Sequence, residues 1–293
     1  MEETSCEKID ANSIKLIKTL SQHKKDIFFL YLLQDNRIAS LSVDSTIRIY
    51  NPLKNYKCEQ VLPHDKVTSL CQLSNGTLVT CSHNQSLSIG TYVIPNAHSS
   101  SINSVIPLSG SRLATCSDDR TIKIWSAEYP YEETPLQVLE GFEAEVKCIV
   151  YIEERDMLVA GDRDRTIQLW CMKTYKRISV VNRSDGGWIE AMDKIDRDRV
   201  IFGHGDIFTI VNVSKCEVEE EVEDAMMGYV TSFLKLNEKY LVCGCAGGFC
   251  LYDMVERTYQ IVESHHAVAA SALIKIDENT FASCAENIKI WRY

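Results

Sequence analysis

Short segments in which apolar and polar residues alternate recur along the chain. The clearest is Leu113–Trp125, in which LATC and TIKIW flank the polar turn SDDR. Two such runs joined by a tight polar turn predict a β-hairpin. Similar runs are STIRIY (Ser45–Tyr50), RTIQLW (Arg165–Trp170) and NIKIW (Asn287–Trp291). A hairpin that recurs in this way indicates a repeat protein.

The repeats have a nearly constant length. The residues that close successive runs lie 35 to 45 residues apart, and they are Tyr50, Gly90, Trp125, Trp170, Val211, Tyr252 and Trp291. Polar turns such as SNG (Ser74–Gly76) separate the runs, as hairpin loops do. Strands alternating with turns suggest a barrel, a sandwich or a propeller. A fixed period of about 40 residues favours the propeller.

This pattern resembles that of the WD-repeat β-propellers, over nearly the whole chain from about Ser13 onward. The resemblance implies an all-β fold, a seven-bladed β-propeller of four-stranded antiparallel blades. We expect a short tail at residues 1–12 and a single domain at 13–293. The seventh unit ends in its third strand at Trp291, whereas Ile14–Leu20 has no blade of its own. The N-terminal strand is therefore expected to close the last blade, which removes an exposed sheet edge.

The resemblance also assigns a role to polar residues that recur in the repeats. A hydroxyl, an imidazole and a carboxylate are the ingredients of nucleophilic catalysis, but a catalytic set occurs once, and this set recurs. In WD repeats these groups and an indole form a buried hydrogen-bonded tetrad, which avoids a cost of about 1–3 kcal/mol for each unpaired group. The fullest copies are His98, Thr115, Asp119 and Trp125 in unit three, and His23, Ser40, Asp44 and Tyr50 in unit one.

Other units keep only part of the tetrad, and units five and six have lost most of it. The retained members are His64 and Thr80 in unit two, Asp164 and Trp170 in unit four, and His266, Ser283 and Trp291 in unit seven. The substitutes are Asn84 and Gly90 in unit two, Phe142 and Ala160 in unit four, and Glu286 or Asn287 in unit seven. The strand register of residues 182–230 is correspondingly less well defined by the sequence.

Composition limits the classes of partner. The net charge of -10 makes non-specific nucleic-acid binding unexpected. No apolar run approaches the roughly 20 residues that span a bilayer, and the acidic N-terminus has no signal-peptide pattern, so we expect no membrane insertion. The twelve cysteines include no C-x-x-C pair, which favours reduced, buried thiols in a cytoplasmic or nuclear protein.

No metal or other cofactor is expected. Adjacent residues of a strand point to opposite faces, so His265 and His266 are poorly placed to bind one ion. One histidine in the tetrad and one facing solvent is the better interpretation.

Partner binding is expected on the face that carries the Asp-containing turns, where WD propellers most often take peptides. Exposed aromatic and arginine residues are the usual anchors of such surfaces. The arginines either bind acidic or phosphorylated peptides or neutralise nearby carboxylates. The candidate residues are Lys25, Val43, His83, Ser100, Asp118, Arg120, Glu145, Arg163, Arg165 and Trp188.

Two further segments are candidates for contacts. The acidic run Glu217–Asp224 corresponds to an outer strand and the following turn, and is either a solvated rim or a dock for a basic partner. The long loop Ser126–Pro135 is expected on the opposite face, where Tyr129 and Tyr131 are either recognition anchors or parts of an ordinary loop.

The sequence therefore predicts a non-enzymatic scaffold or adaptor that binds other proteins or peptides, as a subunit of a complex of unspecified oligomeric state. One alternative is a substrate-recognition subunit of a ubiquitin ligase, which would need a separate ligase partner because no F-box-like or RING-like segment is visible. Another is a structural subunit of a coat, pore or RNA-processing complex. Catalysis is the remote option, because no unique nucleophile–base pair is visible.

Overall fold

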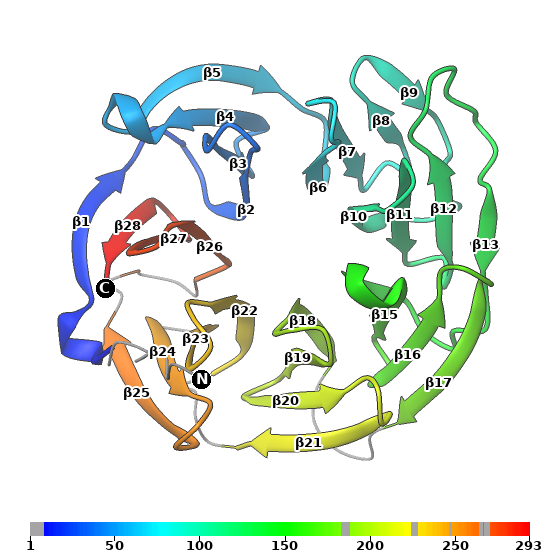
Figure 1. Ribbon diagram of the computed structural model, residues 1–293. Coiled ribbons are helices and arrows are strands. Elements are labelled where there is room, and N and C mark those ends of the chain that lie inside the picture. Colours follow the sequence, from blue (N-terminus) through cyan, green and yellow to red (C-terminus); the bar gives the residue numbers. More distant parts are fainter. Residues whose placement is uncertain (1–8, 183–187, 224–227, 246–247, 264–265, 267–269) are drawn as a thin grey trace.

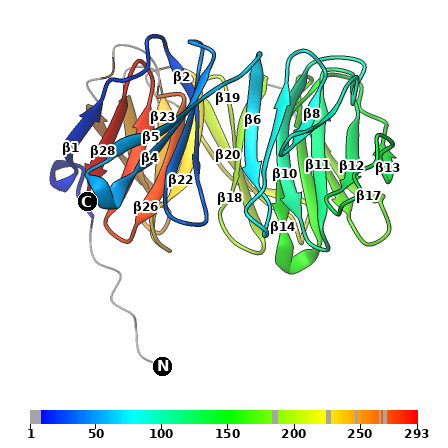
Figure 2. The ribbon, with the colours of Figure 1, turned by 90° about the horizontal axis from the view of Figure 1, so that it is seen from above.

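The computed structural model describes residues 9–182, 188–223, 228–245, 248–263, 266 and 270–293. They form seven four-stranded antiparallel sheets, arranged as blades of a closed ring around a central axis (Figure 1). The prediction of a seven-bladed β-propeller is confirmed. Seen from the side, the blades stand next to one another with their strands running between two faces (Figure 2).

Each blade is built from consecutive strands, the first nearest the axis and the last on the rim (Figure 1). Blades one to three are β2 (Ile27–Leu32), β3 (Ile38–Ser42), β4 (Thr46–Asn51) and β5 (Lys57–Pro63); β6 (Val67–Gln72), β7 (Leu78–Ser82), β8 (Leu87–Ile89) and β9 (Tyr92–Ile94); and β10 (Ile102–Leu108), β11 (Arg112–Ser117), β12 (Ile122–Ser126) and β13 (Gln137–Leu139).

Blades four to six follow the same plan. They are β14 (Val146–Ile152), β15 (Met157–Asp162), β16 (Thr166–Cys171) and β17 (Lys176–Asn182); β18 (Ile189–Lys194), β19 (Arg199–His204), β20 (Ile207–Asn212) and β21 (Glu217–Val222); and β22 (Val230–Lys235), β23 (Tyr240–Cys245), β24 (Gly248–Asp253) and β25 (Thr258–Glu263). The acidic run Glu217–Asp224 thus supplies an outer strand, as predicted, up to Val222.

Blade seven joins the two ends of the chain. Its strands are β26 (Ala272–Asp277), β27 (Thr280–Cys284), β28 (Ile288–Arg292) and, on the rim, β1 (Lys15–Leu20). Strand β1 pairs antiparallel with β28, which confirms the predicted closure. Ile9 is also buried against blades six and seven, so the packed part of the chain begins before the expected boundary at residue 13.

The apolar core lies between the blades. One cluster joins Ala114 and Ile124 of blade three to Ile149 and Leu158 of blade four, and similar clusters occupy other interfaces. Burial of apolar surface at about 25 cal/mol per Å² holds neighbouring blades together. Neighbouring blades approach closely at Gly203, where a Cβ atom would lie 2.7 Å from Val230.

The turns divide the surface into two faces. Because each blade is antiparallel, the turns between second and third strands lie on one face, together with the connections from each outer strand to the next inner strand. We call this the Asp-turn face. It carries residues 23–26, 43–45, 64–66, 83–85, 98–101, 118–120, 143–145, 163–165 and 188. The other turns lie on the opposite face.

The inner strands of blades one to six share a β-bulge next to the Asp-turn face. The pairing between first and second strands shifts register at the second residue of the inner strand, and a bulge of this kind re-aims the extra side chain. The bulged residues include Phe28, Thr68, Asn103, Lys147 and Thr231.

Candidate functional site

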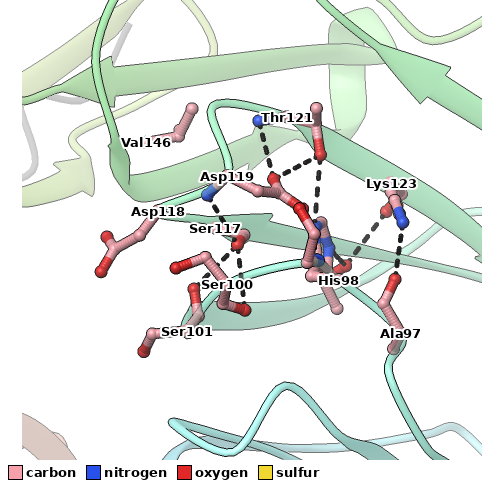
Figure 3. Close-up of polar contacts among 12 residues, drawn as sticks. Ala97, His98, Ser100, Ser101, Ser117, Asp118, Asp119, Thr121, Lys123 and Val146 are labelled. Carbon is pink, nitrogen blue, oxygen red and sulfur yellow. Dashed lines mark hydrogen bonds and ion pairs between the residues drawn. The ribbon is translucent and has the colours of Figure 1, made fainter.

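The polar tetrad of blade three forms one continuous network. His98 Nδ1 lies 2.8 Å from Asp119 Oδ2, and His98 Nε2 lies 2.7 Å from Thr115 Oγ1. Trp125 Nε1–H donates to the same hydroxyl at 2.8 Å. Thr121 Oγ1–H donates to the Asp119 carboxylate at 2.6 Å, within the turn that joins β11 to β12 (Figure 3).

Burial and hydrogen bonding determine which side chains of this network are charged. Burial lowers the pKa of His98, although the bond to Asp119 opposes this effect. Burial acts to raise the pKa of Asp119, but the hydrogen bonds from His98 and Thr121 outweigh it and hold the pKa well below its ordinary value. At neutral pH a neutral imidazole therefore donates from Nδ1 to the Asp119 carboxylate and accepts a hydrogen bond at Nε2 from the Thr115 hydroxyl, whose oxygen accepts the indole N–H.

Blade one repeats the histidine, hydroxyl and carboxylate of this network. His23 Nδ1 lies 2.9 Å from Asp44 Oδ2, and His23 Nε2 lies 2.7 Å from Ser40 Oγ. Tyr50 is fully buried beside them, but its hydroxyl has no hydrogen-bond partner among the described residues, so the expectation that Tyr50 joins the tetrad is wrong. Burial raises the pKa of Tyr50 to about 12, so the phenol stays neutral.

Blade seven forms the network with a glutamate. His266 Nε2 lies 2.8 Å from Ser283 Oγ, which also accepts the Trp291 indole N–H at 2.8 Å. Glu286 takes the place of the turn aspartate, with Oε1 3.3 Å from His266 Nδ1. Of the two candidates for this position, the structure brings Glu286 to the histidine. His265 lies outside the described residues.

Blade two does not bring its retained residues together. His64 Nε2–H donates to the Ser42 carbonyl of blade one at 3.1 Å, and His64 Nδ1 accepts the Val67 N–H at 3.3 Å. The imidazole is thus not joined to Thr80, which lies in β7. The grouping of His64 with Thr80 is wrong, because both ring nitrogens of His64 are bonded to other groups, and Asn84 Oδ1 accepts from Ser86 Oγ–H at 2.8 Å instead of from a histidine.

Blade four separates its two retained residues. Asp164 is exposed, and the buried Asp162 Oδ1 accepts the backbone N–H groups of Asp164 and Thr166 at 3.0 and 2.9 Å. Phe142 replaces the histidine and stacks on Trp170, with ring centroids 6.0 Å apart. The joint role expected for Asp164 and Trp170 is wrong, because a phenyl ring cannot bond the carboxylate and Ala160 has no hydroxyl for the indole.

The histidine networks of blades one, three and seven are embedded in the blades. His98 and Thr115 have almost no exposed surface, and the same holds for Ser40 and Ser283. A group that acts on a substrate must be within reach of it. In this arrangement the tetrad holds the turn and anchors the histidine segment to its blade.

An aromatic–arginine pair lies on the Asp-turn face between blades four and five. The Arg163 guanidinium carbon lies 3.8 Å from the centre of the Trp188 ring, and Arg163 NH1 lies 3.2 Å from Glu145 Oε1. The Arg163 N–H also donates to the Glu145 carbonyl at 2.9 Å. Trp188 remains 52% exposed. Three of the predicted candidates are thus brought together, and we call them the Trp188 cluster.

Asp118 is held in a second polar group on the same face. It accepts from Lys147 Nζ at 2.5 Å and from Asn103 Nδ2 at 2.7 Å. Figure 3 shows its side chain directed away from the tetrad. Lys147 and Asn103 were not among the predicted candidates, although each directly follows the first apolar residue of an inner strand, which is the position of the bulge.

The other candidates are spread over this face. Lys25, Val43, His83 and Arg120 are exposed, and Ser100 and Arg165 are half-buried. His83 Nδ1 lies 2.6 Å from Ser101 Oγ, and Arg120 NH1 lies 3.5 Å from the Glu143 carbonyl.

The opposite face carries an aromatic group in the loop between β12 and β13. Tyr131 lies between Tyr92 and Tyr129, with ring centroids 5.6 and 5.8 Å away. Tyr129 is 85% exposed.

The fold and the recurring network place the protein in a class, the closed β-propellers built from hairpin repeats. The family model described as "WD domain, G-beta repeat" matches residues 14–51, 56–89, 90–126 and 133–171. These segments make up half of the chain, which therefore belongs to the WD-repeat family. They end at Cys171, the last residue of β16, while blades five to seven have the same four-strand order.

A curated relative is similar to part of the chain. Apoptotic protease-activating factor 1 of Rattus norvegicus is 24% identical over 156 residues. The aligned region covers 52% of this chain and 9% of that protein, so the chain spans only a small part of this relative's length.

Among the described residues, none belongs to a helix with the length and apolar character that crossing a membrane requires.

Proposed function

We propose that this protein is a non-enzymatic scaffold that binds partner proteins or peptides on its Asp-turn face. The observation that carries the proposal is the Trp188 cluster. Trp188 offers an exposed indole, and Arg163 lies against one side of it. Tryptophan and arginine dominate the binding energy of many protein interfaces.

The cluster is ordered before any partner binds. Glu145 holds the Arg163 guanidinium, and the two residues are also joined through the backbone. Side chains that are already fixed lose less entropy on association, so a preformed site favours affinity. The closed ring below the cluster supplies a rigid support.

The setting that we propose is a multi-subunit complex in the cytoplasm or nucleus. The described cysteines are free thiols, which suits a reducing compartment. The partners recovered from cells would distinguish two more specific roles. One is a recognition subunit of a ubiquitin ligase, and the other is a structural part of a coat, pore or RNA-processing complex.

Affinity capture of the whole chain from cells, followed by quantitative mass spectrometry, tests the proposal. Arg163→Glu and Trp188→Ala should each reduce recovery of the main partners by roughly tenfold, the effect expected for a central anchor. Arg165→Glu should weaken capture in the same direction. Their melting temperatures should stay close to that of the wild type, because these side chains are exposed or half-buried and a surface ion pair contributes little to stability.

The matched control is Arg197→Glu, an exposed arginine in the loop between β18 and β19 on the opposite face. It should leave capture unchanged. Equal recovery by the wild type, Arg163→Glu and Trp188→Ala would reject the proposal, and a lowered melting temperature in Arg163→Glu would show that Arg163 has a structural role.

A further inference from the structure

The interface between blades one and two lacks a contact that the next two interfaces along the chain have. Where blade two meets blade three, the bulged Thr68 Oγ1–H donates to the Ile102 carbonyl at 2.6 Å. Where blade three meets blade four, Asn103 Nδ2–H donates to the Val146 carbonyl at 2.8 Å. Blade one has Phe28 in the corresponding bulge of β2. A phenyl ring has no donor, so this side chain cannot bridge to blade two.

A cavity of about 560 Å³ lies at this interface on the Asp-turn face. Phe28, Val43 and Val67 supply apolar walls to it, from β2, the turn after β3 and β6. Its volume is within the range of roughly 300–1,000 Å³ that is usual for ligand pockets. Val43 is 55% exposed, so apolar surface is open to solvent at the cavity.

The loss of the tetrad in blade two shapes this cavity. In blades one and three the histidine bonds a hydroxyl of its own blade, whereas His64 bonds the Ser42 carbonyl across the interface. Both ring nitrogens of His64 are used, Nε2 as donor and Nδ1 as acceptor, so the imidazole forms a neutral, fixed part of the wall.

The charged side chain that lines the cavity is positive. Lys66 is among the residues that line it, and the described lining residues include no carboxylate. His83 adds a second imidazole, held at Nδ1 by Ser101. An apolar cavity with a cationic side chain at its edge complements an apolar group that lies next to a negative charge.

We propose that this cavity binds a large apolar side chain of an extended partner peptide, and that a carboxylate on a neighbouring residue of the same peptide pairs with Lys66. The inference rests on the proposed binding role of the Asp-turn face and specifies the chemistry of the partner. It also assigns a function to the departure of blades one and two from the pattern of their neighbours.

Selection of peptides on the intact chain provides the test. A phage-displayed library of random peptides is selected against the whole protein, and the enriched sequences are synthesised with a fluorescent label. The inference predicts enrichment of a Leu, Ile, Met, Phe or Trp residue close to an Asp or Glu. Fluorescence polarisation then measures the affinity of a selected peptide for each variant.

Two variants make the lining of the cavity polar by different means. Val43→Asp places a carboxylate at its mouth, and Phe28→Asn introduces the donor that Asn103 provides in blade three. Each should weaken binding by roughly tenfold or more, as expected when an anchor side chain loses its pocket. Val93→Asp is the matched control, because Val93 has a similar exposure of 51% but lies in β9 on the rim. It should bind like the wild type.

Lys66→Glu tests the charge. This variant should bind a peptide that contains the acidic residue more weakly than the wild type does. It should bind the same peptide with serine at that position about as tightly as the wild type. Selection of basic peptides, or equal affinity of the wild type, Val43→Asp and Phe28→Asn, would overturn the inference. If cellular partners still depend on Arg163 and Trp188 in that case, only the cavity inference fails and the proposed function stands.

Discussion

At the scale of single residues, one hydroxyl decides whether the tryptophan of a blade has a hydrogen-bond partner. Thr115 and Ser283 accept the indole N–H groups of Trp125 and Trp291. Ala160 occupies the equivalent position in blade four, opposite Gln168 in the sheet. The buried Trp170 N–H has no partner there among the described residues.

Ala160→Ser should therefore stabilise the protein, by up to about 1 kcal/mol, because the new hydroxyl accepts the Trp170 N–H. Thr115→Ala should lower the free energy of unfolding by about 1–3 kcal/mol, because it leaves His98 and Trp125 without their shared hydrogen-bond partner. Urea unfolding measures both changes. Ala114→Ser is the control, since it adds the same hydroxyl at a buried site without an indole and should destabilise. An equal decrease in the free energy of unfolding in Ala160→Ser and Ala114→Ser would contradict this explanation.

The tetrad histidines also make stability depend on pH. Burial lowers the pKa of His23, His98 and His266 in the folded protein. In the unfolded chain a histidine binds a proton near pH 6.5. The unfolded state therefore binds more protons as the pH falls below that value, and stability is lost. The depressed pKa of Asp119 acts in the same direction only at more acidic pH, below about 3.9.

The melting temperature should accordingly fall between pH 7.5 and pH 5.5. His98→Gln should be less stable at all these pH values and should show a smaller dependence on pH, because one of the titrating groups is gone. A wild-type melting temperature that is constant across this interval would show that the tetrad histidines do not resist protonation.

At the scale of strands and blades, β1 is the element that closes the ring. It forms the rim of blade seven through its pairing with β28, from Lys15 opposite Arg292 to Leu20 opposite Ile288. Leu20 is buried in a cluster with residues of blades one and seven. Without β1 the β28 edge would expose unpaired backbone groups, which promote association with other chains.

Deletion of residues 1–20 should therefore lower the melting temperature and cause aggregation, whereas deletion of residues 1–8 keeps β1 and should have a small effect. Differential scanning fluorimetry and size-exclusion chromatography measure the two outcomes. A monomer of unchanged melting temperature after removal of residues 1–20 would mean that closure by β1 contributes nothing to stability.

The blades were more predictable than the contacts between them. Alternation and the spacing of residues such as Trp125 and Trp170 depend on the local sequence, so the number of blades and the closing strand follow from the pattern. The direction of the His64 side chain depends on Ser42, which belongs to another blade. The Trp188 cluster likewise joins residues from two blades. Contacts of this kind depend on spatial neighbours that a repeat pattern does not specify.

At the scale of the whole molecule, the repeats supply a closed ring, and some of the differences between repeats reach its surface. The histidine–hydroxyl pairs of blades one, three and seven are buried and closely similar. The Trp188 cluster and the cavity beside Phe28 each occur where a blade departs from that pattern, and both lie on the Asp-turn face. The central claim is therefore that partners bind this face.

Lysine-directed chemical cross-linking of the purified complex, read by mass spectrometry, tests this claim most directly, because both faces carry exposed lysines. Lys24, Lys25 and Lys66 lie on the Asp-turn face, whereas Lys54, Lys173 and Lys215 lie in turns of the opposite face. The account predicts that cross-links to the main partner concentrate on the first three residues. Cross-links concentrated on Lys54, Lys173 and Lys215 would contradict it.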